Sequence, residues 1–202
     1  SLERYQEVER RLRELEVLRQ VAQVINRRLE MHTLLEEVCM QVANVLGYRD
    51  VEILLVEGDE LVMRAARGME IASGQRIPLA RGMVGRVART GQAAFAPDVS
   101  LDPDYVEAIP GTQSEIVVPL RKGGVVIGVL NVESPKRGGL TLDDLHLLSL
   151  LADQVSVAIE NAALYDRLSQ HTSDLETMVA ERTTNLAVAL ERARQADRLK
   201  TR

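Results

Sequence analysis

The segment with the clearest possible chemistry is a glycine-flanked stretch with arginines close to it in sequence. Residues 82–85 have the sequence Gly-Met-Val-Gly, and Arg81, Arg86 and Arg89 lie beside them. Backbone N–H groups at a helix N-terminus attract anions, and nearby guanidinium groups strengthen that attraction. Glycines at such a position also permit close packing of a helix on a sheet, and acidic residues surround the segment: Asp98, Asp102, Asp104, Glu107 and Glu115. The pattern is compatible with an anion site and with a packing role.

The other reactive side chains form no catalytic or metal-binding pattern. Cys39 is the only cysteine, which excludes an intramolecular disulfide and a multi-cysteine zinc or iron–sulfur site, and we expect it to be a small buried hydrophobic residue. His32, His146 and His171 are scattered, and none shares a helix face with a carboxylate and a second histidine. Without paired carboxylates, a nucleophile with a base, or a phosphate loop, we predict no catalytic residues and no metal site.

The composition limits the kind of partner and the kind of core. A chain of 202 residues allows one domain with extra helix, or two small domains. Apolar residues make up 46% and charged residues 27%, the balance of a globular protein, whereas aromatic residues are only 2%. The core must therefore be aliphatic. Residues 31–165 hold eleven basic and eighteen acidic residues, so we expect no nucleic-acid partner.

The chain carries no targeting signal that the sequence makes visible. No stretch approaches the roughly 20 apolar residues of a membrane span, and no signal-peptide pattern opens the chain, so we expect no membrane contact here. The single cysteine is typical of a reducing compartment, and we predict a cytoplasmic protein. Both ends of the chain have helical patterns, which suggests a fragment of a longer protein.

Two helices are expected at the N-terminal end. Apolar residues recur at steps of three and four from Leu2 to Leu29, which predicts an amphipathic helix. A break at residues 30–32 follows, and we expect Thr33 to be the N-cap of a second helix that ends at Gly47.

The middle of the chain changes to the alternation of β-strands. Strands are expected at residues 51–56, 61–66, 76–79, 93–96, 115–120 and 125–132, with hairpin turns at 57–60 and 121–124. A short helix is expected at residues 82–90, ended by Gly91, and residues 97–112 are rich in Asp, Pro and Gly and are expected to be loop. The sheet should be largely antiparallel.

The C-terminal part is expected to be one long helix. Thr141 or Asp143 opens it, and no proline or glycine occurs from there to Arg202, a length of roughly 90 Å at 1.5 Å per residue. A helix of this length needs a partner, so we predict a homodimer through the N- and C-terminal helices. The stalk positions expected to contact the second copy are Ala158, Ala162, Tyr165, Leu168, Leu175, Val179 and Leu186.

Two segments together resemble the GAF family. They are residues 80–92, with Asp98-Val99 and Asp102-Pro103 behind them, and residues 114–133, which end in Ile-Gly-Val-Leu-Asn-Val-Glu. The resemblance implies an α+β fold with about six antiparallel strands, helices on one face and a lid from about Arg81 to Thr112 on the other. It also implies three parts: an N-terminal coiled-coil helix at 1–30, a sensory GAF domain at 31–165 and a C-terminal signalling helix at 166–202.

The resemblance implies a ligand pocket under the lid without naming the ligand. GAF relatives that attach a tetrapyrrole use a cysteine near the lid, those that reduce free methionine sulfoxide need several cysteines, and cyclic-nucleotide binders carry an Asn-Lys-Phe-Asp-Glu set. This sequence matches none of these patterns, so the cofactor is unknown. The candidate lid and pocket residues are Arg81, Gly82, Met83, Val84, Gly85, Phe95, Asp98, Tyr105 and Glu115.

The C-terminal segment resembles the connecting helix of bacterial sensor histidine kinases. Residues 175–186 and 196–202 are similar to the helix that precedes the phospho-accepting histidine, although the histidine box itself is absent. We therefore predict a regulatory domain of a two-component protein that relays a signal through a parallel helical dimer. The alternatives are the input domain of a cyclase, phosphodiesterase or transcription regulator, a structural dimerisation spacer, and a small-molecule enzyme on the same fold.

Overall fold

The computed structural model describes residues 2–25, 30–68 and 74–200 of the chain. They fall into two units, Ser1–Ala162 and Ala163–Arg202, and each is described by itself. The first unit contains the strands and most of the helices, and the second is helical.

Two helices come first in the chain. α1 spans Leu2–Ile25, as the apolar periodicity predicts; residues 26–29, expected in the same helix, lie outside the described residues. α2 spans Met31–Leu46 and ends at Gly47, whose φ of 72° is the left-handed conformation that glycine adopts without strain. α1 contacts α2 within the first unit, and Leu18 packs against the core that α2 helps to form.

The expected N-cap of α2 at Thr33 is wrong. The N-cap is Glu30, and the Leu34 N–H donates to the Glu30 carbonyl at 3.0 Å. Met31 packs against the core from the first turn of the helix. The packing of Met31 on the core stabilises the first turn of α2, which the capping preferences of the residues alone do not predict.

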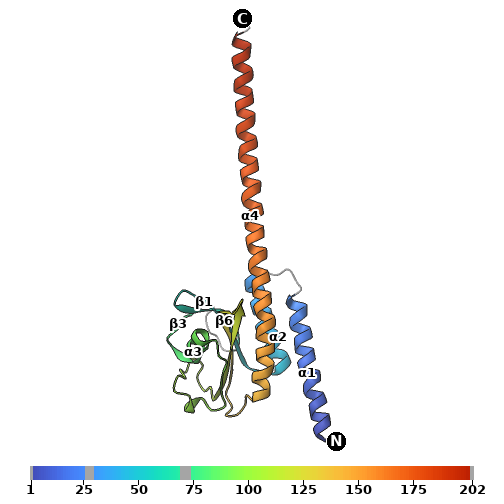
Figure 1. Cartoon of the computed structure of the whole chain (residues 1–202), viewed down its shortest axis with the longest axis vertical. Helices are drawn as coiled ribbons and strands as arrows, with labels where there is room; N and C mark the ends of the chain where they lie inside the picture. Colours follow the sequence, from blue (N-terminus) through green and yellow to red (C-terminus); the bar gives the residue numbers. More distant parts are fainter. Residues whose placement is uncertain (1, 26–29, 69–73, 201–202) are drawn as a thin grey trace. The chain divides into compact units, whose positions relative to one another are not determined.

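The six described strands form one antiparallel sheet with the order β3-β2-β1-β6-β5-β4 (Figure 1). The strands are β1 Asp50–Glu57, β2 Glu60–Arg67, β3 Arg76–Pro78, β4 Ala94–Ala96, β5 Ser114–Lys122 and β6 Val125–Ser134. The predicted strands and both predicted hairpins are confirmed. Glu57 pairs with Glu60, and Lys122 pairs with Val125, so the turn of each hairpin consists of two residues.

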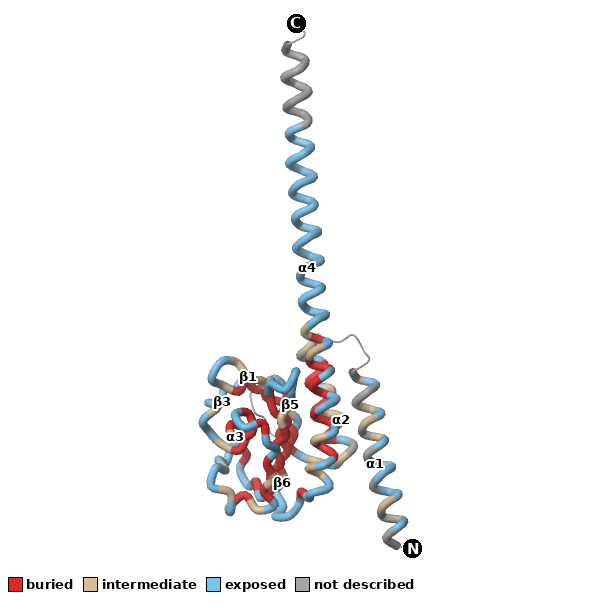
Figure 2. The backbone as a smooth tube through the Cα atoms, viewed as in Figure 1, coloured by how far each residue is buried: buried red, intermediate tan, exposed pale blue. Residues whose placement is uncertain are grey.

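The sheet buries a different layer on each face because side chains alternate along a strand. Val51 and Ile53 of β1 belong to a core cluster with α2 and the first turns of α4, whereas Leu54 belongs to a second cluster with α3 and the lid. Figure 2 shows buried residues throughout the sheet and along its neighbouring helices. Even residues of β1 and odd residues of β5 and β6 thus face the lid.

The lid begins with α3, Gly82–Thr90, which ends at Gly91 as predicted. Residues 97–112, expected to be loop, also contain a short 3₁₀ helix, Val99–Leu101. Asp98 caps it, because its carboxylate accepts from the Ser100 N–H at 3.1 Å.

α4 spans Leu142–Lys200, and Thr141 rather than Asp143 opens it. The Thr141 hydroxyl accepts from the Asp144 N–H at 3.3 Å, and the Asp144 carboxylate accepts from the Thr141 N–H at 2.7 Å, which is a capping box. Within the first unit, α4 buries Leu148, Leu151 and Val155 against the sheet.

The expectation that no segment approaches a membrane span needs a correction. Residues Leu142–Ala189 include an 18-residue window with a mean hydropathy of 1.3, long and apolar enough to cross a bilayer. Half of that window is buried inside the structure. The core helix of a globular protein has the same property, because its apolar side chains pack on the domain.

Candidate functional site

A polar pocket lies between the sheet and the lid. Its volume is about 240 Å³. Four sheet residues at its base come from three neighbouring strands: Glu52 on β1 pairs with Asn131 on β6, and Glu133 on β6 pairs with Glu115 on β5. All four face the lid by the alternation of their strands. They are almost completely buried, with exposed fractions of 5% for Glu52, 2% for Asn131, 4% for Glu133 and 4% for Glu115.

The Asn131 amide joins two of these carboxylates. Its Nδ2 lies 3.4 Å from Glu52 Oε2 and 3.1 Å from Glu133 Oε1. Because the nitrogen is the donor to both carboxylates, the amide oxygen points elsewhere. Asn131 Oδ1 and Glu52 Oε1 are both buried and have no hydrogen-bond partner in the structure. Buried polar atoms without a partner are rare in native proteins and call for an explanation.

Burial and mutual repulsion change the acidity of the three carboxyl groups. Burial, and then the charge of Glu133, raises the pKa of Glu52 to about 7. Burial, and then Glu133 and Glu52, raises the pKa of Glu115 well above its usual range. Burial also raises the pKa of Glu133, although hydrogen bonds from Thr112 and Asn131 partly oppose it. The site therefore holds three carboxyl groups that bind protons more readily than exposed ones.

The lid supplies the opposite wall of the pocket. Arg81, Gly82, Met83 and Val84, at the start of α3, line it, together with the loop at Val106–Ala108 and strand β3. Arg81 is exposed. The backbone at the N-terminus of α3 carries a partial positive charge, and the lid wall holds both a cationic residue, Arg81, and an acidic one, Glu107.

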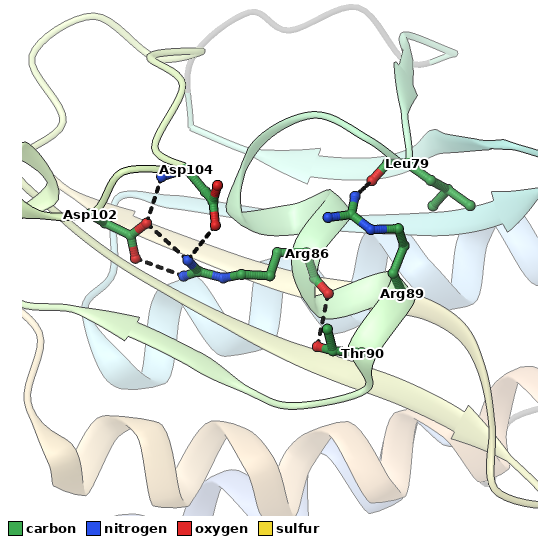
Figure 3. A network of polar contacts seen from close by, with 6 residues as sticks. All are labelled: Leu79, Arg86, Arg89, Thr90, Asp102 and Asp104. Carbon is green, nitrogen blue, oxygen red and sulfur yellow. Dashed lines mark hydrogen bonds and ion pairs between the residues drawn. The ribbon is translucent and has the colours of Figure 1, made fainter.

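The other two lid arginines hold the lid together. Arg86 Nη1 and Nη2 donate to the two oxygens of Asp102 at 3.1 and 2.7 Å, and Nη1 also donates to Asp104 at 2.7 Å (Figure 3). Arg89 donates to the Leu79 carbonyl. Both guanidinium groups are therefore occupied, that of Arg86 by contacts within the lid and that of Arg89 by the segment just before it. Of the three arginines considered for an anion site, only Arg81 lines the pocket.

The structure brings some of the predicted pocket residues together and places others elsewhere. Arg81, Gly82, Met83, Val84 and Glu115 line the pocket. Gly85 serves packing, because a Cβ there would lie 2.3 Å from the Leu79 carbonyl oxygen. Its place in the sequence could not separate that role from ligand contact.

Three further predicted residues do not line the pocket. Phe95 packs with the helices on the other face of the sheet. Asp98 caps the 3₁₀ helix and pairs with Arg137 at 3.1 Å. Tyr105 packs against the lid-side cluster, and burial, then Glu133 and Glu115, raises its pKa to about 12. Tyr105 is therefore close to the carboxylates without lining the cavity.

Glu52, Asn131 and Glu133 were not among the residues predicted from the sequence. The sequence does carry a signal for these three residues, since each is polar and stands at an alternate position of an otherwise apolar strand. Only the strand register shows that the three residues are adjacent.

Neither a metal-ligand cluster nor a second cavity gives another candidate site in the described part of the chain. Across residues 2–25, 30–68 and 74–200, no group of three or more His, Cys, Asp or Glu side chains is arranged to hold a metal ion. A pocket of about 350 Å³ beside α2, lined by His32 and Leu35 among others, contains none of the predicted site residues. Cys39 is buried on α2, with the core on the helix side of the sheet.

The stalk positions fall into two groups. Ala158 and Ala162 are buried in the core cluster of their own chain, and their expected contact with a second copy stays a prediction. Tyr165, Leu168, Leu175, Val179 and Leu186 are exposed in the second unit.

The chain belongs to the GAF domain family, whose model matches residues 28–160. The resemblance seen in the sequence and the predicted six-stranded antiparallel sheet are thereby confirmed. Protein YtsP of Bacillus subtilis is 30% identical over 103 residues, which cover 51% of this chain and 62% of that protein. The Nif-specific regulatory protein of Azospirillum lipoferum is 26% identical over 162 residues, 72% of this chain and 26% of that protein. The chain therefore spans less than two thirds of either relative.

A solved structure adds an enzyme to these similarities. The free methionine-R-sulfoxide reductase of Neisseria meningitidis, in complex with its substrate, has a TM-score of 0.71 and 26% identity. The match covers 78% of this chain and 93% of that one. Proteins similar to this chain thus include both a regulatory protein and an enzyme, and the family alone does not separate the two roles.

Proposed function

We propose that this chain is the sensory module of a signalling protein, in which a small molecule bound under the lid changes the packing of paired α4 helices. The observation that carries the proposal is the pocket itself: buried polar atoms without partners, beneath a lid whose parts are joined to one another by ion pairs. A cavity of this kind is costly for a purely structural domain. The similarity to the Nif-specific regulatory protein supports a regulatory role.

The proposed relay uses a homodimer of parallel helices. From Leu168 to Ala189, positions 168, 172, 175, 179, 182, 186 and 189 alternate steps of four and three, the repeat of a coiled-coil seam. Leu168, Leu175 and Leu186 on this seam are 63%, 60% and 63% exposed. A second copy of the chain would cover them. Val8, Leu12 and Leu15 of α1 are exposed as well, which supports a contribution from the N-terminal helices.

The proposed output is a histidine kinase domain that follows the chain, as the resemblance of residues 175–186 and 196–202 implies. The alternative output is that of a transcription regulator, and the similarity to a Nif-specific regulatory protein supports a regulatory output of either kind. We place the protein in the cytoplasm, which the buried free thiol of Cys39 supports. We propose no contact of this chain with nucleic acid or membrane.

Native mass spectrometry of the gently purified chain tests the sensory proposal. A retained small molecule is expected, and it should be lost in the variant Glu52→Gln/Asn131→Leu, which removes the negative charge of Glu52 and the amide group of Asn131 from the pocket. The variant Glu160→Gln, at a surface carboxylate that pairs with Lys122, is the control. A chain that retains no ligand and binds none in a metabolite screen would be a structural spacer instead.

Reduction of free methionine sulfoxide is a second candidate, because the Neisseria meningitidis enzyme shares the fold at 26% identity. Cys39 is the only thiol in the sequence and is buried with the helices on the other face of the sheet from the pocket. Incubation with L-methionine-R-sulfoxide and a dithiol reductant, with methionine measured by chromatography, tests this activity. We expect no turnover above that of the Cys39→Ser variant.

A further inference from the structure

The unpartnered atoms of the pocket identify the chemistry of its ligand. Glu52 Oε1 and Asn131 Oδ1 are both hydrogen-bond acceptors, and both belong to pocket-lining residues that are at least nine-tenths buried. A carboxylate oxygen and an amide oxygen need donors. The third buried atom without a partner, Tyr105 Oη, belongs to a residue that does not line the pocket. The partner of the two pocket oxygens must therefore bring N–H or O–H groups into the base of the pocket.

The charge around these atoms separates a cation from a neutral donor. Glu133 and Glu115 lie in the adjacent row of the sheet, directly opposite each other, and Asp50 pairs with Glu133 from the other side. Like charges directly opposite in a sheet destabilise it. Arg86, the lid cation whose charge opposes the rise in the pKa of Glu115, is already bound to Asp102 and Asp104. A water molecule would satisfy the acceptors but would not offset the charge that Glu52 carries when it is ionised, above its pKa of about 7.

We propose that the pocket binds a small molecule with a protonated amino group, whose N–H groups donate to Glu52 Oε1 and Asn131 Oδ1. This inference rests on the proposed ligand-sensing function and names the chemical class of the ligand. The orientation of the Asn131 amide supports it: the nitrogen is held by Glu52 Oε2 and Glu133 Oε1, so its oxygen is fixed as an acceptor. Arg81 and the start of α3 form the other wall, where an acidic group at the far end of the same ligand would be accommodated.

The acidity of the pocket fits a cationic ligand. Burial raises the pKa of Glu52 to about 7, so a bound ammonium group would displace a proton from Glu52 below this pH. The groups that surround Glu52 are Asp50, Glu115, Glu133 and Asn131 on the sheet, Arg81 and Glu107 on the lid, and Arg76 on β3. The acidic groups among them outnumber the two arginines, and Arg76 already pairs with Glu57 and Glu60. Affinity for the ammonium group should therefore rise between pH 6 and pH 8.

Three probes of equal size and one anionic probe test the proposal on the full chain. n-Butylammonium, tetramethylammonium and n-butanol each have about five heavy atoms, and ligands this small bind at best in the millimolar range. The first has charge and donors, the second has charge alone, and the third has a donor alone. The signals of the Asn131 side-chain amide in ¹H–¹⁵N NMR spectra report on binding at the site, and sodium butyrate is the anionic probe.

We expect a saturable shift of the Asn131 signals with n-butylammonium only, with an affinity about tenfold weaker in Glu52→Gln and unchanged in Glu160→Gln. Equal shifts with tetramethylammonium would show unspecific charge attraction and overturn the proposal. Saturation by butyrate or butanol instead would also overturn it, yet would leave a ligand-binding domain intact. If no probe shifts Asn131, the inferred ligand class is wrong, and native mass spectrometry of the purified chain decides separately whether the domain holds any ligand.

Discussion

Arg86 and Asp102 form a two-pronged ion pair, with distances of 3.1 and 2.7 Å between the guanidinium nitrogens and the two carboxylate oxygens. The pair joins α3 to the loop that follows the 3₁₀ helix, and so closes the lid on itself (Figure 3). Burial alone would raise the pKa of Asp102, but hydrogen bonds from Arg86 and from the Asp104 backbone hold it below its ordinary value. The ion pair is therefore formed across the neutral pH range.

The first prediction concerns the lid. Asp102→Asn leaves the partly buried Arg86 guanidinium with a weaker acceptor, and we expect a loss of about 2 kcal/mol in the free energy of unfolding. Faster hydrogen exchange should accompany it in residues 98–112. Asp104→Asn is the control, because Asp104 accepts a single bond and its side chain is 49% exposed; its effect should stay below about 1 kcal/mol. Equal losses in both variants would show that the two-pronged pair is not what holds the lid.

The second prediction concerns Glu52 and pH. Its pKa rises from an ordinary 4.5 to about 7 on folding, so between these values the unfolded chain loses a proton that the folded chain keeps. The contribution of Glu52 to stability is therefore fully present below pH 4.5 and is lost as the pH rises through 7. The loss is about 3 kcal/mol for this shift, at about 1.36 kcal/mol per pH unit. We expect Glu52→Gln to stabilise the domain at pH 8 and not at pH 4.5.

Urea unfolding of the wild type and Glu52→Gln at pH 4.5, 6 and 8 measures this difference. Other carboxylates, such as Asp102, have lowered pKa values and act in the opposite direction at low pH, but they cancel in the comparison between the two proteins. Glu160→Gln should show no such pH dependence. A constant difference between wild type and Glu52→Gln at all three pH values would mean that Glu52 is ionised in the folded domain throughout.

Much of the fold follows from local sequence signals. The hairpin between β1 and β2 is marked by Gly58-Asp59 between two apolar runs, and the end of α3 is marked by Gly91. Thr141 begins α4 with a capping box, a pattern that needs only Thr141 and Asp144, three positions apart. Signals of this kind depend on a few neighbouring residues, which is why the elements and the antiparallel sheet could be predicted.

The site could be predicted only on its lid side. The start of α3 is a contiguous motif, whereas Glu52 is 79 residues from its partner Asn131. The residues meet because β1 and β6 are neighbours in the sheet. The sequence of one strand alone does not determine its register with a strand that is far away in the chain. Phe95 shows the same limit, since a shift of one residue along β4 decides which face of the sheet a side chain occupies.

The third prediction concerns the dimer. The exposed apolar seam of α4 should bring two chains together, so the light-scattering mass should be about twice the 22.4 kDa of one chain. Leu175→Asp places a charge on the seam and should weaken the dimer, whereas Ser173→Asp, off the seam, should not. A chain of residues 31–162 should also dimerise more weakly, because it lacks the seam. If that shorter chain is an equally tight dimer, the main contact lies elsewhere.

The last prediction tests whether the phase of α4 carries the proposed signal, with the chain fused to a histidine-kinase core after Arg202. Deleting the seven residues Thr183–Ala189 removes two turns less roughly 20°, which a left-handed supercoil absorbs. Kinase output should then match that of the undeleted fusion. Deleting only the four residues Thr183–Leu186 removes one turn plus roughly 40°, which puts the apolar seam out of register with the helix that follows. Output should then be fixed high or low, because the two helices present a different face to the kinase. Both deletions begin at Thr183 in the same exposed stretch of α4, so the site of the cut is the same, and the longer deletion is the one expected to preserve output. Equal autophosphorylation rates in the two deletions would rule out a rotational relay and indicate a flexible tether between the domain and its output.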